Sequence, residues 1–242
     1  MSPEVLPYDL PGEPKKTQVR RMFDNIAHRY DFLNHFLSFG SDRRWRRKAV
    51  KKLSDLKPAS ILDVATGTGD FALEGSRLQP QRIMAVDFSE EMLEIARNKV
   101  ARAGLSGKIE FQWADAEDLP FPDTSFEAAT VAFGVRNFGN PLKGLSEMHR
   151  VLVDGGKLVV LEFAMPRAFP FRQVYAFYFK RFLPAIGRWV SKDNSAYSYL
   201  PDSVQAFPQG EEFIELLQRA GFAKAEFTRL SFGIVCLYLA TR

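Results

Sequence analysis

The chain has 242 residues, 46% of them hydrophobic and 26% charged, a composition that excludes a disordered chain and provides apolar material for one sizeable core. Lys and Arg number 33 against 29 Asp and Glu, so the mild formal charge of +4 permits an anionic partner without requiring one. The only cysteine, Cys236, excludes a disulfide framework or a cysteine-based zinc site within one chain and favours a reducing, cytoplasmic setting.

The N-terminal arm, residues 1–15, contains four prolines and is expected to be extended. It lacks the charged-then-apolar plan of a signal peptide, and no apolar run in the chain approaches the roughly 18 residues of a membrane span. The remainder, residues 16–242, is predicted to be one domain that begins with a helical cap over residues 16–55. Apolar residues of the cap recur at three- and four-residue spacing: Val19, Met22, Phe23 and Ile26, then Trp45, Ala49 and Leu53.

Residues 56–165 alternate between short apolar runs and amphipathic stretches. Strands are predicted at residues 60–65, 82–87, 108–114, 126–133 and 157–163, and helices at residues 70–78, 89–103 and 141–152. Strand and helix in alternation favour a parallel sheet with helices on both faces and right-handed crossovers. This segment is the expected cofactor-binding core.

The C-terminal part departs from this alternation. An aromatic-rich insertion over residues 166–208 is predicted to contain a helix followed by a polar loop, and another helix is expected at residues 209–220. The apolar runs at residues 224–231 and 233–240 are joined by little more than a turn, so they are predicted to be antiparallel neighbours. The sequence thus predicts an α/β fold whose mostly parallel sheet ends in an antiparallel C-terminal hairpin.

A glycine turn follows the first predicted strand, in the segment LDVATGTGD. Asp63 lies at the end of the strand, and Gly67 and Gly69 lie in the turn, where glycine lets the backbone approach a ligand and leaves the next helix N-terminus accessible. The second strand ends at Asp87, a carboxylate that can accept both hydroxyls of a ribose. Together these strand ends predict a nucleotide-type cofactor, although either carboxylate alone also suits an ordinary turn.

The details of the turn favour S-adenosylmethionine over a dinucleotide. The third glycine of a dinucleotide fingerprint is replaced by Ala72, which is sometimes tolerated, so NAD remains an alternative. Asp63 suits a cationic amino-acid moiety better than a pyrophosphate. After the third strand, Asp115 and the backbone of Ala116 can reach an adenine amino group and ring nitrogen, whereas Glu117 is expected to face solvent. Three signals at successive strand ends predict one crevice.

Two further stretches suit more than one partner. Residues 43–52 carry seven basic side chains in ten positions and suit, in order of preference, a solvated helix face, a surface for anionic lipid headgroups, or a nucleic-acid-binding helix. The aromatic stretch over residues 169–190 suits either an ordinary packed helix or contact with lipid or an isoprenoid tail. The histidines His28, His35 and His149 lack convergent spacing, so no metal site is predicted.

Several segments resemble known enzymes. Those similar to class I S-adenosylmethionine-dependent methyltransferases are LDVATGTGD, VDFSEEML, ADAEDLPFPDTSFE and FGVRNF. Those similar, more narrowly, to menaquinone and ubiquinone biosynthesis C-methyltransferases are FDNIAHRYDFLNHFLSFGSDRRWR, HRVLVDGGKLVVLEFAMP and YSYLPDSVQAFPQGEEF. The resemblance extends from about Val19 to the C-terminus and is most specific in the YDxLN and FGxRN signatures.

This resemblance implies a seven-stranded methyltransferase sheet, S-adenosylmethionine as cofactor, and C-methylation of a prenylated quinol such as demethylmenaquinol. It assigns cofactor binding to four residues: Thr68, Asp87, Asp115 and Ala116. Ala65 and Thr66 stand where related enzymes often have glycine. Benzoquinol precursors of ubiquinone, other small molecules and, last, RNA remain alternative acceptors. A prenylated acceptor further implies peripheral contact with the inner face of a membrane, and no nucleic-acid partner is expected.

Three residues of the two signatures are expected to act on the quinol. Arg136 follows the fourth strand and is always cationic, so we expect it to lower the quinol pKa or to orient a water that acts as base. A salt bridge at a loop corner is the alternative for Arg136. Tyr30 and Asn34, four residues apart on one helix face, are expected to bind the quinol oxygens, with core and capping roles as the alternative.

Overall fold

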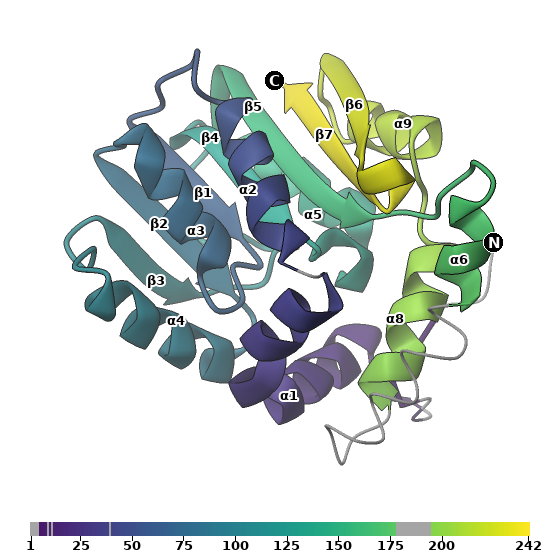
Figure 1. Ribbon diagram of the computed structural model, residues 1–242. Helices are drawn as coiled ribbons and strands as arrows, with labels where there is room; N and C mark the ends of the chain where they lie inside the picture. The colour runs from purple at the N-terminus through teal and green to yellow at the C-terminus, as the bar shows by residue number, and fades with distance from the viewer. Residues whose placement is uncertain (1–4, 9, 11, 39, 178–194) are drawn as a thin grey trace.

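Seven strands form one sheet in the order β3-β2-β1-β4-β5-β7-β6, in a computed structural model that describes residues 5–8, 10, 12–38, 40–177 and 195–242 (Figure 1). The strands are β1 (Ser60–Val64), β2 (Arg82–Asp87), β3 (Ile109–Trp113), β4 (Phe126–Ala132), β5 (Leu152–Phe163), β6 (Lys224–Leu230) and β7 (Val235–Thr241). β1 to β5 pair in parallel, and β7 is antiparallel to both β5 and β6. The predicted sheet and hairpin are confirmed, except that β5 begins at Leu152 rather than at residue 157.

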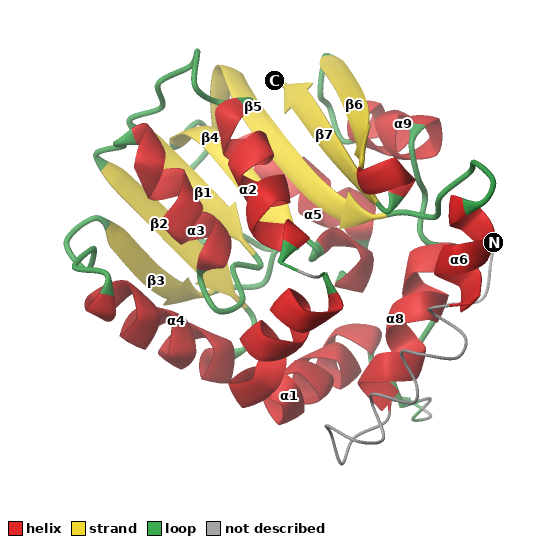
Figure 2. Ribbon diagram, in the orientation of Figure 1, coloured by secondary structure: helices red, strands yellow, loops and turns green. Residues whose placement is uncertain are grey.

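Helices cover both faces of this sheet (Figure 2). Those on one face are α2 (Ser41–Lys51), α3 (Asp70–Gly75) and α4 (Glu90–Arg102), and those on the other are α5 (Pro141–Val151) and α9 (Glu211–Arg219). Neighbouring strand residues point to opposite faces and so supply two cores. Ile61 belongs to the same core as Trp45 of α2, whereas Leu62 belongs to the core of Leu145 of α5.

Side-chain caps begin two of these helices. Ser89 Oγ accepts the N–H of Met92 at 3.1 Å before α4, and Asn140 Oδ1 accepts the N–H of Lys143 at 3.1 Å before α5. Each cap satisfies a backbone donor that the first helical turn leaves unpaired. The caps therefore define where loops from the carboxyl edge of the sheet turn back into helices.

The predicted helical cap consists of two helices, α1 (Lys15–Leu37) and α2, separated by Gly40 at φ 70°. α1 lies across the carboxyl ends of the central strands (Figure 1). It contacts α4, α8 (Ser195–Ala206) and η2 (Val135–Asn137), a 3-10 turn after β4. α1 therefore covers the edge of the sheet at which the loops meet.

Helix α8 corrects one prediction, because residues 195–206 were expected to form a polar loop. α8 buries Tyr199 against Val19 and Met22 of α1. The periodic signal is weak because few apolar residues recur here and Pro201 lies inside the helix. The segment is helical because it packs against apolar residues of α1. Such a contact between distant parts of the chain cannot be read from the local sequence pattern.

The remaining differences are short. The predicted helix over residues 70–78 ends at Gly75 and continues as the 3-10 turn η1 (Ser76–Leu78), and a second such turn, η4 (Ser231–Gly233), joins β6 to β7. In the aromatic insertion, α6 (Phe171–Phe177) begins directly after Pro170. Residues 178–194 of that insertion lie outside the described residues.

Candidate functional site

A cavity opens at the carboxyl ends of the central strands, where α1 forms one of its walls. β1 lies between β2 and β4, so the chain crosses to opposite sides of β1, and open α/β sheets bind ligands at such a switch point. The loops after β1, β2, β3 and β4 form its walls together with α1.

The cavity brings together half of the predicted site residues. Those that line it are Tyr30, Gly67, Asp87, Asp115 and Ala116. Those that are not among the lining residues are Asp63, Thr68, Gly69 and Arg136. The side chain of Asn34 lies outside the described residues, so its expected role stays a prediction.

Asp87, at the end of β2, holds the glycine turn against the cavity. Its Oδ2 accepts the N–H of Gly67 at 2.8 Å, and its Oδ1 accepts the N–H of Ser89 at 2.9 Å. Burial raises the pKa of the Asp87 carboxyl, and these backbone hydrogen bonds oppose the rise. Gly67 has φ 56°, a conformation that glycine adopts without steric cost. Because a carboxylate has about four acceptor sites, Asp87 can also accept hydrogen bonds from ligand hydroxyls.

Asp115 and Ala116 form the wall after β3, and Asp115 is tied to α1. Its Oδ2 accepts a hydrogen bond from Lys16 Nζ at 2.8 Å, and its Oδ1 accepts the N–H of Glu117 at 2.9 Å. The hydrogen bond to Asp115 raises the pKa of Lys16. Glu117 was expected to face solvent but lines the cavity, because its Oε1 accepts the N–H of Asn140 at 2.9 Å.

Asp63 braces the strands beneath the cavity instead of lining it. Its Oδ2 accepts the hydroxyl of Thr66 and its Oδ1 accepts the hydroxyl of Thr130, each at 2.6 Å. Asp63 and Thr130 are paired residues of the neighbouring strands β1 and β4. Burial raises the pKa of Asp63 to about 6. The expected contact with a cationic cofactor moiety is thus replaced by two internal hydroxyl partners.

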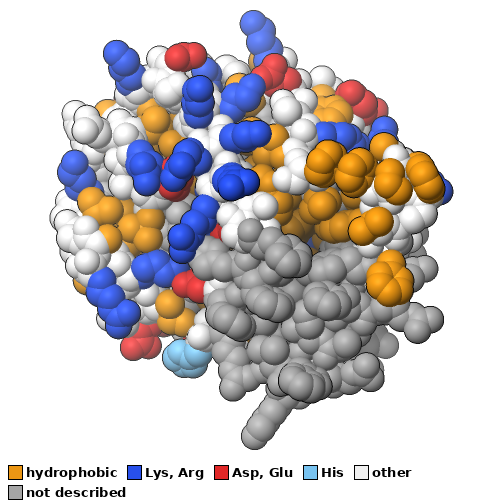
Figure 3. All heavy atoms as spheres, in the orientation of Figure 1, with side chains coloured by type: hydrophobic (Ala, Val, Ile, Leu, Met, Phe, Trp, Pro, Cys, Tyr) orange, Lys and Arg blue, Asp and Glu red, His pale blue; other side chains and the backbone are white. Residues whose placement is uncertain are grey.

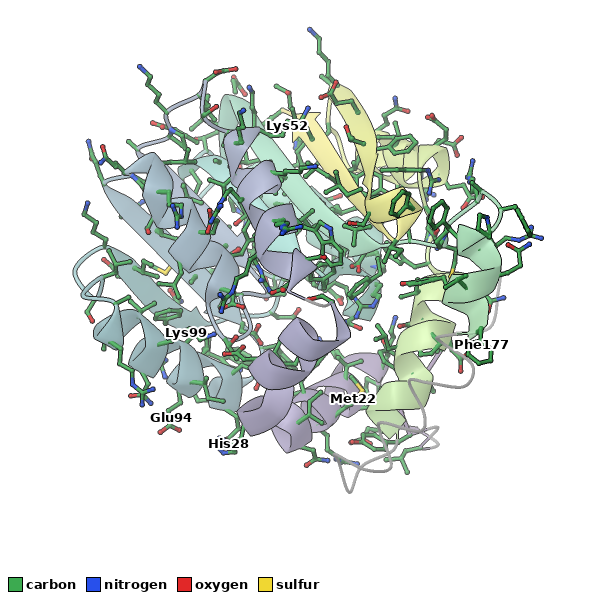
Figure 4. The ribbon with its side chains drawn as sticks, in the orientation of Figure 1. Met22, His28, Lys52, Glu94, Lys99 and Phe177 are labelled. Carbon is green, nitrogen blue, oxygen red and sulfur yellow. The ribbon has the colours of Figure 1, made fainter. Side chains whose placement is uncertain are left out.

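Thr68 takes part in a charged network that joins the glycine turn to α1. Its hydroxyl donates to Asp31 Oδ1 at 2.5 Å and accepts from Lys99 Nζ at 3.0 Å. Lys99, labelled in Figure 4, also pairs with Asp31 and, at 2.8 Å, with Asp70 at the start of α3. The resemblance assigned Thr68 to the cofactor, but the structure directs it to this network. Sequence reasoning missed Asp31, although it follows Tyr30 within the YDxLN signature.

Two glycines allow backbone segments to approach closely around the site. A Cβ on Gly69, which has φ 83° before α3, would lie 3.2 Å from Ala96 Cβ. A Cβ on Gly134, in the FGVRNF segment, would lie 2.7 Å from Ala65 Cβ. Ala65 itself has φ 51°, an uncommon conformation for a residue other than glycine. The loops after β1 and β4 therefore touch at the cavity, and only glycine fits opposite Ala65.

Helix α1 supplies the outer wall of the cavity. Its lining residues are Lys16, Val19, Arg20, Phe23 and Tyr30. The rings of Phe23 and Tyr30 pack edge to face with centroids 5.8 Å apart. A Cβ on Gly67 would lie 3.8 Å from Tyr30 Cε1, so Tyr30 reaches over the glycine turn. The cap thus places a phenol next to the predicted cofactor turn.

Arg136 was expected to enter the crevice, but its side chain turns into the protein. Its Nη1 lies 2.7 Å from Glu162 Oε1 of β5, and both side chains are buried. The guanidinium also lies over the ring of Phe163, 5.4 Å from its centroid. The structure therefore shows the salt bridge that was the alternative for Arg136. A carboxylate 26 residues further along the chain provides the nearby partner.

Asn137, the neighbour of Arg136, does line the cavity. Its Nδ2 donates to the carbonyl of Phe133 at 3.1 Å, and its Oδ1 accepts the hydroxyl of Tyr199 from α8 at 3.1 Å. Phe133 also lines the cavity, and its ring stacks on Phe163 at 4.3 Å. The FGVRNF segment thus presents an amide and an aromatic ring to the cavity and its arginine to the core.

Other candidate groups lie away from the cavity. His28 is exposed on α1 (Figure 4), and His149 packs edge-on to Phe222 with centroids 5.2 Å apart. The side chain of His35 lies outside the described residues. Within the described ranges, no cluster of three His, Cys, Asp or Glu side chains could hold a metal ion. No helix in those same ranges is long and apolar enough to cross a membrane.

Comparison with known proteins agrees with this geometry. Residues 12–242 match the ubiE/COQ5 methyltransferase family. A demethylmenaquinone methyltransferase of Bacteroides fragilis is 52% identical over 240 residues, covering 99% of this chain and 98% of that protein. A ubiquinone/menaquinone biosynthesis C-methyltransferase of Geobacter sulfurreducens is 50% identical over 226 residues, covering 93% of this chain and 88% of that protein.

A solved structure shares the fold. The S-adenosylmethionine-dependent methyltransferase of Thermotoga maritima superposes with a TM-score of 0.64 at 22% identity. The match covers 92% of this chain and 99% of that chain. At this identity the likeness shows the class I methyltransferase fold alone.

Proposed function

Since this chain belongs to the ubiE/COQ5 methyltransferase family, which depends on S-adenosylmethionine, we propose that it methylates a ring carbon of demethylmenaquinol to form menaquinol. One observation carries the proposal: the cofactor-type carboxylates of the strand ends and the aromatic cap of α1 line the same cavity. The two named relatives, at 52% and 50% identity, support a prenylated quinol as the acceptor.

The residues present fit S-adenosylmethionine. Asp87 lines the cavity and can accept the ribose hydroxyls while its oxygens hold Gly67 and Ser89 in place. Asp115 and the backbone of Ala116 line the next stretch of wall and suit the adenine amino group and ring nitrogen. We assign cofactor binding to these strand-end groups. We assign a structural role to the three other predicted residues, which hold the glycine turn after β1 in its conformation: Asp63, Thr68 and Gly69.

S-adenosylmethionine would supply a methyl group on a sulfonium sulfur, so the departing thioether would need no protonation, and the methylated ring carbon would give up its proton to water. The protein must therefore orient the quinol ring and stabilise negative charge on its oxygen as the ring carbon becomes nucleophilic. Tyr30 and Asn137 carry hydrogen-bond donors in the cavity and are assigned to the quinol oxygens. Phe23, Phe133 and Phe138 provide apolar walls for the ring and exclude water.

We assign Arg136 a positioning role. Its guanidinium donates to Glu162 and to the carbonyl of Phe133, and that carbonyl also accepts the amide of Asn137. Arg136 therefore acts on the quinol through Phe133 and Asn137, both of which line the cavity. This replaces the direct effect on the quinol pKa that the sequence alone suggests.

The test is transfer of labelled methyl from S-adenosylmethionine to chemically reduced demethylmenaquinol in detergent. A demethylated benzoquinol and transfer RNA serve as parallel acceptors, because relatives are named for both quinone types and the basic helix leaves RNA open. We expect label on the naphthoquinol. Label on the benzoquinol alone would move the acceptor to the ubiquinone pathway. Absence of label on either quinol, with cofactor binding demonstrated, would contradict the proposed function.

A further inference from the structure

Large apolar side chains are exposed together at one corner of the molecule. We call them the aromatic patch: the exposed Phe169, Val174, Phe177 and Phe232, together with the half-buried Phe171. Phe169 is 80% exposed, Phe232 70%, Phe177 67% and Val174 64%. The rings of Phe171 and Phe232 stack with centroids 4.1 Å apart, so α6 and η4 form one continuous surface. Contiguous exposed apolar surface of this kind marks an interaction site.

A second surface, the basic face of α2, consists of Arg43, Arg44, Arg47, Lys48 and Lys51, all exposed. The single acid of α2, Asp42, is buried and paired with Arg46 at 2.6 Å, so it offsets none of these exposed charges locally. The basic face therefore presents cations over the full length of the helix.

The two surfaces are adjoining. Trp45 on the buried side of α2 donates from Nε1 to Ser231 Oγ at 2.8 Å, and Ser231 precedes Phe232 of the aromatic patch. Figure 3 shows basic side chains gathered over α2 and hydrophobic ones beside them, over α6 and the β6–β7 turn, on the same face of the molecule. Arg167 and Arg172 add exposed cations next to the aromatic rings.

We propose that the aromatic patch and the basic face of α2 together dock the protein on an anionic lipid bilayer. Aromatic side chains with neighbouring cations are suited to the headgroup boundary, where rings enter the apolar layer and Lys and Arg meet anionic headgroups. A second copy of the chain fits less well. In a symmetric dimer the five cations of the basic face would lie opposite the same five cations of the other copy. The inference rests on the proposed function only for the reason that membrane binding would be useful: a prenylated quinol resides in the bilayer.

The experiment measures binding to extruded vesicles of phosphatidylcholine, with and without phosphatidylglycerol, in the absence of quinol and cofactor. Because neither is present, failure here is distinct from failure of the proposed function. Three double variants are compared with the wild type. They are Phe169→Ser with Phe232→Ser, Arg44→Ala with Lys48→Ala, and the control Lys143→Ala with Arg219→Ala. The control residues are exposed cations of α5 and α9, on the opposite face of the sheet.

The wild type should bind anionic vesicles more tightly than neutral ones, and the preference should weaken with salt. Loss of Arg44 and Lys48 should weaken binding to anionic vesicles about 30-fold, or about fivefold for each cation, and leave binding to neutral vesicles unchanged. Loss of Phe169 and Phe232 should weaken binding to both at least about tenfold. The control pair should bind as the wild type does, and all variants should methylate a detergent-solubilised acceptor normally.

Equal losses in the Arg44/Lys48 and Lys143/Arg219 pairs would overturn the proposal, because binding would then follow net charge instead of this surface. Unchanged vesicle binding in the phenylalanine pair would also overturn it. If that pair instead converts a dimer to a monomer in sedimentation, the aromatic patch is an interface between two copies. If the loss of Arg44 and Lys48 abolishes binding to an RNA oligonucleotide but not to vesicles, the basic face serves nucleic acid.

Discussion

Arg136 and Glu162 form an ion pair inside the protein, with Nη1 and Oε1 2.7 Å apart and both side chains buried. Arg136 follows β4 and Glu162 lies near the end of β5, so the pair joins two neighbouring strand ends. Phe133, whose carbonyl accepts from the same guanidinium, lines the cavity. The ion pair therefore supports the wall on which Phe133 and Asn137 are presented.

Removal of one partner should be costly. Glu162→Gln leaves the buried Arg136 cation without a counter-charge, and we expect the free energy of unfolding to fall by about 3 to 5 kcal/mol. Asp123→Asn is the matched control, because Asp123 is 71% exposed and pairs with Arg150 at 2.8 Å. That exposed pair should contribute less than about 1 kcal/mol. Urea denaturation measures both, and equal losses would contradict a special role for the buried pair.

The cofactor assignment of Asp87 predicts a specific loss of affinity. Asp87→Ala should weaken binding of S-adenosylmethionine about 10- to 150-fold, the range for loss of hydrogen bonds to a charged group at about 1.5 to 3 kcal/mol. Asp118→Ala is the control, because Asp118 is exposed and does not line the cavity. Isothermal titration calorimetry measures both dissociation constants. An affinity unchanged by Asp87→Ala would remove Asp87 from the ribose site.

Asp63 should make stability depend on pH. Its pKa of about 6 in the folded protein exceeds the ordinary 3.8, so the folded state holds this proton more tightly than the unfolded state. The resulting stabilisation is fully present below about pH 4 and is lost as the pH rises through about 6, a change of about 3 kcal/mol.

Asp63→Asn cannot ionise and should not show this loss. The difference in unfolding free energy, variant minus wild type, should therefore rise by about 3 kcal/mol between about pH 4 and pH 7. Urea denaturation across that range measures it, and comparison of the two proteins cancels the titration of all other groups. A difference that stays constant with pH would show that the Asp63 pKa is not raised.

The contact between Ala65 and Gly134 can be tested by exchanging alanine and glycine between the two positions. Gly134→Ala places a Cβ 2.7 Å from Ala65 Cβ and should reduce the free energy of unfolding by about 1 to 3 kcal/mol. The control Gly107→Ala meets nothing within 4 Å and should be nearly neutral. Adding Ala65→Gly to Gly134→Ala should restore part of the loss, which a double-mutant cycle quantifies. Simple additivity of the two changes would mean that the contact is not the cause.

The assignment of Tyr30 and Asn137 to the quinol oxygens predicts losses in turnover. Tyr30→Phe and Asn137→Ala should each lower kcat about 10- to 150-fold, because a donor to a developing negative charge is removed. The dissociation constant of S-adenosylmethionine should change less than about twofold, since neither side chain is assigned to the cofactor. Arg136→Met should lower kcat as well and should also lower stability. Equal losses in kcat and cofactor affinity would indicate structural roles for Tyr30 and Asn137.

Much of the fold follows from local pattern. Buried parallel strands need apolar runs such as residues 82–87, and the helices between them need an amphipathic period, so both are visible in the sequence. Parallel strands end at one edge, and this rule alone brings Asp87 and Asp115 to one cavity. The signatures YDxLN and FGxRN identified the family without any geometry.

Side-chain direction at the loops could not be predicted in the same way. Arg136 turns inward because Glu162 of β5 lies within reach, and Thr68 leaves the cavity because Asp31 and Lys99 meet it from α1 and α4. Glu117 enters the cavity wall because it receives the N–H of Asn140. The sequence determined which strands and strand-end residues exist, and the described helices other than α8. Only the tertiary structure decided which loop side chains face the cavity, because that depends on partners far apart along the chain.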